Sequence, residues 1–209
     1  MGTTRCKKDS LGEMDSLCSS KSVGGMGFRD IQKFNNALLA KQVWRLVHQK
    51  DTLLFKVFSA RYFPNCSVLD APIHPKCSYA WRSILQALEV IEKGAIWRVW
   101  SGQQIEAWKH RRLPDPCYSK IITLRVNSIV SRVGDLFYAN TRTWDPGKLV
   151  ANFYPWEAEM VSRVHVSEVC EEDLLVWPFT TDGNYSVKST YRLLASEEWN
   201  ANPSSSTIT

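Results

Sequence analysis

Residues 78–93 carry the clearest periodic pattern in the chain. Apolar side chains recur at intervals of three and four residues, at Trp81, Ile84, Leu85, Leu88 and Ile91. This spacing places all five on one face of an α-helix, and such a face has to be buried against another element. Ser78 is a candidate N-cap, and Gly94 stands where a left-handed C-terminal residue belongs. The sequence therefore predicts a helix that needs a partner.

The partner is predicted in residues 30–49. Asp30 is a candidate N-cap, and the apolar face comprises Ile31, Phe34, Leu38, Leu39, Val43, Leu46 and Val47. A shorter helix is predicted over residues 52–61, with Pro64 ending it. The two long helices should form an antiparallel or crossing pair, in which the Trp81 face contacts Phe34, Leu38 and Leu46. Trp44 and Trp81 should then both be buried.

Short alternating runs predict two β-hairpins. Residues 95–100 and 103–108 flank a Ser-Gly pair, and residues 174–180 and 183–185 flank an Asp-Gly pair. Short helices are predicted from Asp145-Pro146, from Tyr154-Pro155 and from near Ser186. The expected fold class is α+β and mostly helical, with an N-terminal helical unit that includes one hairpin and a looser C-terminal α+β unit.

The balance of charge changes sign close to the boundary between these units. Residues 1–125 hold 20 Lys and Arg against 10 Asp and Glu, whereas residues 126–209 hold 6 against 11. We expect a loop or disordered stretch over 1–22, a basic helical unit over 23–110, an acidic mixed unit over 111–199 and a disordered tail over 200–209. The basic half favours a polyanionic partner, or it is an ordinary solvated surface, or it docks on the acidic half. No apolar run is long enough for a transmembrane helix.

Nine tryptophans suggest a site within the basic half. Trp serves mainly for packing, but it also stacks on nucleic-acid bases. Basic residues bracket several tryptophans in the predicted hairpin and the loop after it, over residues 97–125. The candidate contacts for RNA or DNA are Arg98, Trp100, Trp108, Lys109, Arg111 and Arg112. Binding through them would be weak and salt-dependent.

The other chemistries find little support in the residues. The six cysteines include no Cys-x-x-Cys pair, and no apolar signal segment follows Met1. Reduced thiols in an intracellular protein are therefore expected. Cys66, His74 and Cys77 lie close in sequence, but their spacing is poor for zinc. The chain also contains no Asp-Asp pair, no Gly-x-Ser-x-Gly elbow and no phosphate-binding loop. We expect no catalytic residue, metal, cofactor, small-molecule substrate or membrane partner.

The order of short sequence blocks resembles a known family. These blocks are residues 24–30 (GGMGFRD), 34–46, 61–64 (RYFP), 78–84 (SYAWRSI), 133–136 (VGDL), 144–145 (WD), 175–177 (LVW) and 182–189 (DGNYSVKS). Together they resemble plant LINE-type (non-LTR) retrotransposon reverse transcriptases, in the region between the polymerase core and a zinc-binding reverse-transcriptase module. Short uncharacterised plant mitochondrial and nuclear proteins carry similar blocks. The resemblance covers about residues 14–199.

The resemblance implies that both catalytic parts of such a polyprotein are absent. The aromatic-Ala-Asp-Asp turn of the polymerase does not occur, the ribonuclease H domain would lie downstream, and the zinc module stops after its first helix. The chain departs from the family at residues 100–102 (WSG) and 110–114 (HRRLP). The expected function is a non-enzymatic remnant of a retrotransposon polyprotein; the alternative is a nucleic-acid-binding module built on residues 97–125. Nucleus and mitochondrion are both open as the compartment.

Overall fold

The computed structural model describes residues 28–110, 112–113, 120–125, 129–167 and 172–196; the stretches predicted over 1–22 and 200–209 lie outside these ranges. In chain order the elements are α2 (Ile31–His48), α3 (Leu53–Tyr62), η2 (Val68–Asp70), α4 (Tyr79–Gln86), α5 (Leu88–Gly94), β1 (Ile96–Arg98), η3 (Val133–Leu136), α6 (Pro146–Asn152), α7 (Pro155–Ser162), β2 (Leu174–Val176) and α8 (Val187–Ala195). The chain is thus α+β and mostly helical, as predicted.

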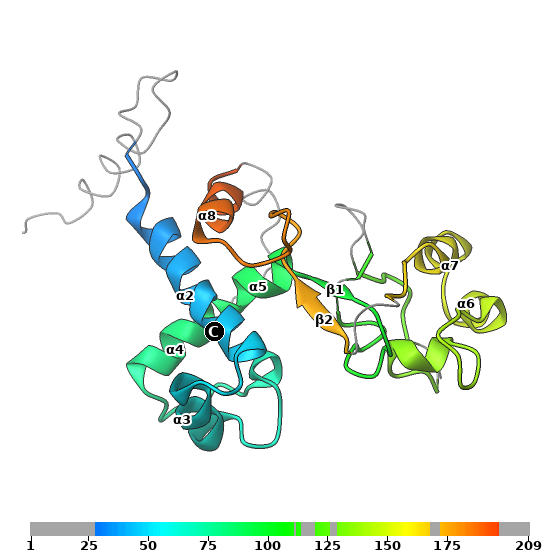
Figure 1. Cartoon of the computed structure of the whole chain (residues 1–209), viewed down its shortest axis with the longest axis horizontal. Coiled ribbons are helices and arrows are strands. Elements are labelled where there is room, and N and C mark those ends of the chain that lie inside the picture. Colours follow the sequence, from blue (N-terminus) through cyan, green and yellow to red (C-terminus); the bar gives the residue numbers. More distant parts are fainter. Residues whose placement is uncertain (1–27, 111, 114–119, 126–128, 168–171, 197–209) are drawn as a thin grey trace, which may run out of the picture.

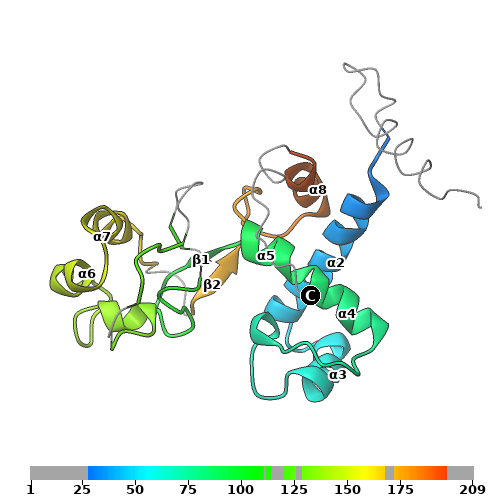
Figure 2. The same ribbon diagram turned by 180° about the vertical axis from the view of Figure 1, so that it is seen from behind.

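The small antiparallel sheet of β1 and β2 stands between two groups of helices. Helices α2, α3, α4, α5 and α8 lie on one side of it, and α6 and α7 lie on the other (Figure 1). The view from behind shows the same division (Figure 2). None of the helices in the described ranges combines the length and apolar character needed to span a bilayer.

Helices α2 and α3 each begin after a capping side chain, the predicted cap Asp30 for α2 and Thr52, for which no cap was predicted, for α3. The Asp30 side chain accepts a hydrogen bond from the Lys33 N–H at 3.0 Å, and Thr52 Oγ1 accepts one from the Phe55 N–H at 3.3 Å. Each side chain satisfies a backbone donor that the first helical turn leaves unpaired. The predicted helices over 30–49 and 52–61 are confirmed within one residue at each end.

The helix predicted over 78–93 is two helices, α4 and α5, joined at Ala87. The Ala87 N–H donates to the carbonyls of both Ser83 and Ile84, at 3.3 and 3.1 Å. The chain therefore tightens at Ala87 into a 3₁₀-like turn. The turn inserts no extra residue, and the apolar spacing passes through it unchanged. The five predicted apolar residues are therefore all buried.

Gly94 has a different role from the predicted one. It is the last residue of α5 and has no positive φ, so it is not a left-handed cap. A Cβ on Gly94 would overlap the indole ring of Trp177 instead. The glycine is needed because a buried Trp from a distant part of the chain packs directly on the helix backbone.

Aromatic rings fill the core of the larger helical group. Trp81 is 0% exposed and stacks on Tyr62 at 4.8 Å between ring centroids, and Trp44 meets Trp177 edge-on at 6.2 Å. The burial of Trp44 and Trp81 is confirmed. The predicted contact of the Trp81 face with Phe34, Leu38 and Leu46 is wrong in part, because Leu38 is 41% exposed. Phe34, near the start of α2, packs against Tyr191 of α8.

The hairpin predicted over 95–108 is wrong. Strand β1 pairs with β2, in the register Ile96 with Val176 and Arg98 with Leu174. Residues 103–108 run beside residues 131–133 instead; the Ala107 N–H donates to the Ser131 carbonyl at 2.9 Å. The second predicted hairpin keeps its turn, where the Trp177 N–H donates to the Gly183 carbonyl at 2.8 Å, but β2 takes β1 as its strand partner.

Two buried clusters divide the chain differently from the predicted units of 23–110 and 111–199. The first cluster joins residues between 37 and 95 to residues between 175 and 194, and the second joins residues between 99 and 164. The last described segment therefore crosses back from the second cluster to the first. Trp97 of β1 packs against both clusters, so the sheet is the junction between them.

Candidate nucleic-acid interface

The structure does not gather the predicted nucleic-acid contacts on one surface. Arg98 is exposed on β1, and the Arg142 guanidinium covers the Trp100 ring at 5.2 Å. The other contacts lie elsewhere: Trp108 and Arg112 turn toward Phe153 of the second cluster, Lys109 is bound to Asp70, and Arg111 is outside the described residues. The predicted aromatic and basic hairpin is therefore not assembled.

Arg112 is the clearest error among these predictions. Its side chain is buried, with the residue 3% exposed, and its Nη1 donates to the Ala107 carbonyl. Burial lowers the pKa of Arg112 to about 10, against the opposing effect of the Glu157 carboxylate. Nε and Nη2 have no hydrogen-bond partner among the described residues. A guanidinium in this position cannot reach a phosphate on the surface.

Glu157 of α7 is a second charged group inside this cluster. It is fully buried, and its carboxylate accepts the N–H of Ile122 at 2.5 Å and the N–H of Thr123 at 3.3 Å. The Thr123 hydroxyl binds the same carboxylate. Glu157 thus fixes the segment at 120–125 on α7 and supplies a negative charge near Arg112.

Asp173 holds the chain together just before β2. Its Oδ1 accepts the N–H groups of Trp100, Ser101 and Gly102 at 2.8, 3.0 and 2.8 Å, and its Oδ2 accepts that of Gln104 at 3.0 Å. We call these four donors the amide cradle. Gly102 has a φ of +66°, and the backbone at Val133 and Gly134 occupies the space that a Cβ would need. The cradle explains why residues 100–104 bend away from β1 instead of forming a hairpin.

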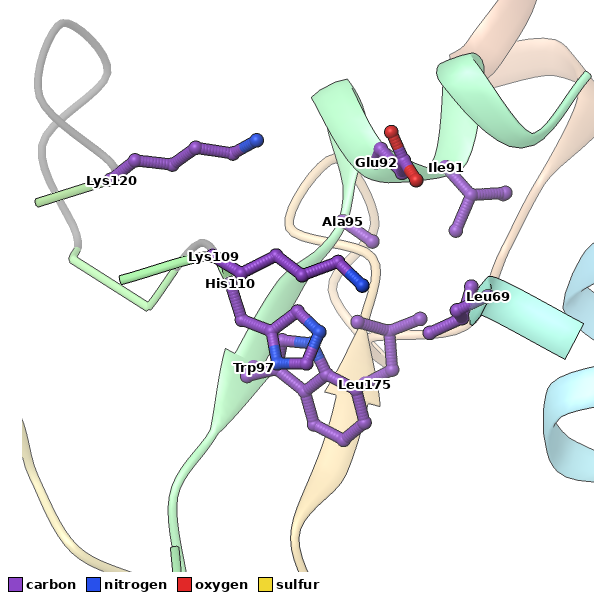
Figure 3. A pocket seen from close by; sticks show the side chains of 9 residues that line it. All are labelled: Leu69, Ile91, Glu92, Ala95, Trp97, Lys109, His110, Lys120 and Leu175. Carbon is purple, nitrogen blue, oxygen red and sulfur yellow. The ribbon is translucent and has the colours of Figure 1, made fainter. Parts of the chain in front are cut away.

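A pocket opens at the junction of the two clusters (Figure 3). Its volume is about 160 Å³, and its lining is Leu69, Ile91, Glu92, Ala95, Trp97, Lys109, His110, Lys120 and Leu175. The lining comes from η2, α5, both strands and the loop after residue 108. The region predicted to contact nucleic acid, residues 97–125, includes Trp97, Lys109 and Lys120. The residues of η2, α5 and β2 that complete the walls lie outside this region, and nothing in the sequence pointed to them.

Charged groups of both signs lie near His110 at this pocket. The His110 ring lies 5.3 Å from Trp97 between centroids, and its Nδ1 faces the Glu106 N–H at 2.9 Å. Burial is the main reason why the pKa of His110 is lowered; Lys109 and Lys120 lower it further, while Glu106 and Asp70 oppose them. The hydrogen bond to Asp70 raises the pKa of Lys109, which remains an ammonium group.

The described residues hold no group of three His, Cys, Asp or Glu side chains placed to bind a metal ion. Of the residues considered for zinc, Cys66 is exposed, Cys77 is half-buried, and both are free thiols. His74 is exposed, and its Nδ1 accepts the Lys76 N–H at 3.3 Å. His74 thus has a local capping role in the turn before α4.

Comparison with known proteins identifies two relatives from Arabidopsis thaliana. One is named an uncharacterized mitochondrial protein; it is 42% identical over 100 residues, which are 47% of this chain and 65% of that protein. The other is named "Putative ribonuclease H protein"; it is 30% identical over 203 residues, which are 94% of this chain and 32% of that protein. No family model matches, and no solved structure has significant similarity. The chain is therefore similar to plant proteins and spans about a third of the longer of these two relatives.

Proposed function

We propose that the chain is a non-catalytic segment derived from a plant LINE-type reverse-transcriptase polyprotein, from the region between the polymerase core and the zinc-binding module. The ordered sequence blocks support this origin. The relative named as a ribonuclease H supports it as well, because almost all of this chain aligns with about a third of that longer protein. In this proposal the chain is a folded linker with no active site of its own.

The hydrogen bonding of the buried carboxylates is the observation that carries the proposal. Glu157 and Asp173 are the buried carboxylates of the described residues, and both are occupied by backbone N–H groups of their own chain. Polymerase and ribonuclease H chemistry both need carboxylates that converge on metal ions and leave coordination positions open for substrate. Here the buried carboxylates hold loops in place.

The test is an activity assay on the full chain. The substrates are a primed RNA template with nucleoside triphosphates and an RNA–DNA hybrid, each with Mg²⁺ and with Mn²⁺. We expect neither extension nor cleavage above a buffer control. Activity that disappears when one exposed carboxylate, such as Glu172 or Asp135, is changed to its amide would contradict the proposal.

A second candidate function is contact with RNA or DNA, and the surface charge favours it. Two of the acidic residues after position 125, Glu157 and Asp173, are buried, so this half presents less negative charge than its composition indicates. Arg98 and Lys120 are exposed at the junction, and Arg125 is exposed beside Trp108 of the second cluster. The ribonuclease H name of one relative agrees with a nucleic-acid partner.

Fluorescence anisotropy with single-stranded RNA, single-stranded DNA and an RNA–DNA hybrid tests this contact. We expect affinity to fall with salt, because bound phosphates release counterions. Arg98→Gln should reduce the salt slope by about 1, and Lys76→Gln, at an exposed site distant in sequence, is the matched control. An affinity that salt does not change would exclude a phosphate-driven mode.

The name of one relative also bears on the compartment. Because that relative is named a mitochondrial protein, we propose the mitochondrion over the nucleus. A fluorescent fusion of the full coding sequence in plant cells should co-localise with a mitochondrial dye. Fluorescence confined to the nucleus would contradict this assignment.

A further inference from the structure

We propose that the pocket at the junction of the two clusters binds one pyrimidine nucleotide, with a preference for cytosine. This inference rests on the second candidate function, contact with nucleic acid, and names the unit that would be recognised. The ring of the base enters the pocket, and the phosphate stays at its opening beside Lys120. The occupant is an unpaired nucleotide of a strand or a free nucleotide, which present the same chemistry.

The size of the pocket sets the class of base. Its volume of about 160 Å³ is close to that of engineered apolar cavities of roughly 150 Å³ that hold one benzene ring. A pyrimidine is a single ring, whereas the fused rings of a purine need more room. Leu69, Ile91 and Leu175 supply apolar wall, and Trp97 adds an aromatic group beside His110 (Figure 3). The pocket therefore suits a flat, single-ring ligand.

The charge of the lining sets the class of substituent. Lys109, His110 and Lys120 lie along one side of the pocket, and Glu92 is the acidic residue of the lining. Asp70 neutralises the Lys109 ammonium in an ion pair, and the lowered pKa of His110 favours its neutral form, so the positive charge of the lining comes from Lys120. The Lys120 side chain extends toward the pocket from the adjacent loop (Figure 3) and would attract an anionic group on the ligand, such as a nucleotide phosphate.

Glu92 gives the preference among pyrimidines. Its carboxylate can only accept hydrogen bonds when ionised, and the exocyclic amine of cytosine is a donor. Uracil presents a carbonyl oxygen at the same position, and the carboxylate would repel it because both groups are hydrogen-bond acceptors. Glu92 is exposed and belongs to α5, so its replacement should not disturb the fold.

Calorimetric titration of the full chain with CMP, UMP, AMP, cytidine and inorganic phosphate tests the inference. We expect CMP to bind more tightly than AMP, because the second ring of a purine would extend out of the open side of the pocket and lose contact with its walls. Lys120→Ala should weaken the affinity for CMP about three- to fivefold, which is the scale of an exposed ion pair. Lys76→Ala should leave that affinity unchanged. Glu92→Gln should abolish the preference for CMP over UMP.

A second readout uses His110, which is near Glu106, Asp70, Lys109, Lys120 and the Glu92 side of the pocket. The phosphate should stabilise the imidazolium, so CMP should raise the His110 pKa measured by proton NMR. His110→Gln assigns the resonance. An unchanged titration in saturating CMP would contradict binding at this pocket.

Three outcomes overturn the inference. CMP does not bind at a concentration of about 10 mM, AMP binds as tightly as CMP, or phosphate alone binds as tightly as CMP. Oligonucleotides separate the two proposals. If they bind while CMP does not, the pocket inference fails and the nucleic-acid contact stands. If CMP binds in the predicted way while oligonucleotides do not, the nucleic-acid contact fails and the pocket is a site for free nucleotides.

Discussion

The amide cradle around Asp173 gives the sharpest test of what holds the two clusters together. In Asp173→Asn the side chain keeps its size but has one oxygen instead of two. If that oxygen replaces Oδ1, the three N–H groups of residues 100–102 keep an acceptor, although a neutral one. The new amide group then faces the Gln104 N–H, and two donors oppose each other.

The expected cost follows from these bonds. The Gln104 N–H is only part-buried, so leaving it without an acceptor costs about 1 kcal/mol, the low end of the range for a buried donor. A hydrogen bond to a charged acceptor is stronger by about 1 kcal/mol than one to a neutral acceptor, and three such bonds are weakened here. Because neighbouring bonds are not additive, we expect a total of about 3–5 kcal/mol. That is a large part of the roughly 5–15 kcal/mol by which domains of this kind are stable.

Urea denaturation followed by tryptophan fluorescence and far-UV circular dichroism measures the loss. With a slope of about 2 kcal/mol per molar urea, the midpoint should fall by about 1.5–2.5 M. Asp51→Asn, at an exposed site before α3, is the matched control and should keep the wild-type midpoint. Amide hydrogen exchange at residues 100–104 should accelerate in Asp173→Asn. A midpoint within experimental error of wild type would show that the cradle does not stabilise the fold.

Three further predictions concern the core and the junction. Trp81→Ala removes a fully buried ring and should cost about 3–5 kcal/mol in thermal unfolding; a wild-type transition would mean that Trp81 is not in the core. Gly94→Ala should destabilise by about 1–3 kcal/mol, because its methyl group would overlap Trp177; urea denaturation should show this loss, and unchanged stability would refute the close contact. Burial lowers the pKa of His110, so the unfolded chain binds this proton more readily. Stability should therefore fall as the pH drops below about 6.5, and His110→Gln should show a shallower pH dependence over that range.

Local signals predicted the helices well. The predicted caps Asp30 and Ser78 both cap the helices that follow them, and such caps can be found in sequence because a cap and the N–H that it accepts are two or three residues apart. The apolar spacing over 81–91 likewise identified a buried face. These features depend on neighbours within a few residues, so one sequence is enough to find them.

The sheet and the candidate site depended on distant partners and were not predictable in the same way. Strands of three residues are too short to show alternation, and β1 and β2 are separated by 75 residues. The burial of Arg112 is not visible in its local sequence, because an exposed basic loop and a buried guanidinium look alike there. The groups around Arg112 come from distant positions: the Phe153 ring lies 6.0 Å from its guanidinium, and the charge of Glu157 acts on it. The role of Gly94 likewise depends on Trp177, which lies more than 80 positions further along the chain.

The segment at 172–196 connects the two clusters physically. It begins at Asp173 in the amide cradle, and its Tyr185 hydroxyl donates to the Ala37 carbonyl of α2 at 2.8 Å. The Tyr191 hydroxyl accepts the Asp30 N–H at 2.9 Å, so the same segment also covers the start of α2.

These contacts span about 150 residues of sequence, so loop closure opposes them, and folding of the second cluster within that loop reduces this cost. The pocket also depends on this segment, because Leu175 comes from it while Leu69 and Lys109 come from earlier parts of the chain. Nucleotide binding at the pocket and docking of the last segment should therefore be coupled. Saturating CMP should slow amide exchange in β2, and it should do so less in Lys120→Ala than in the wild-type chain.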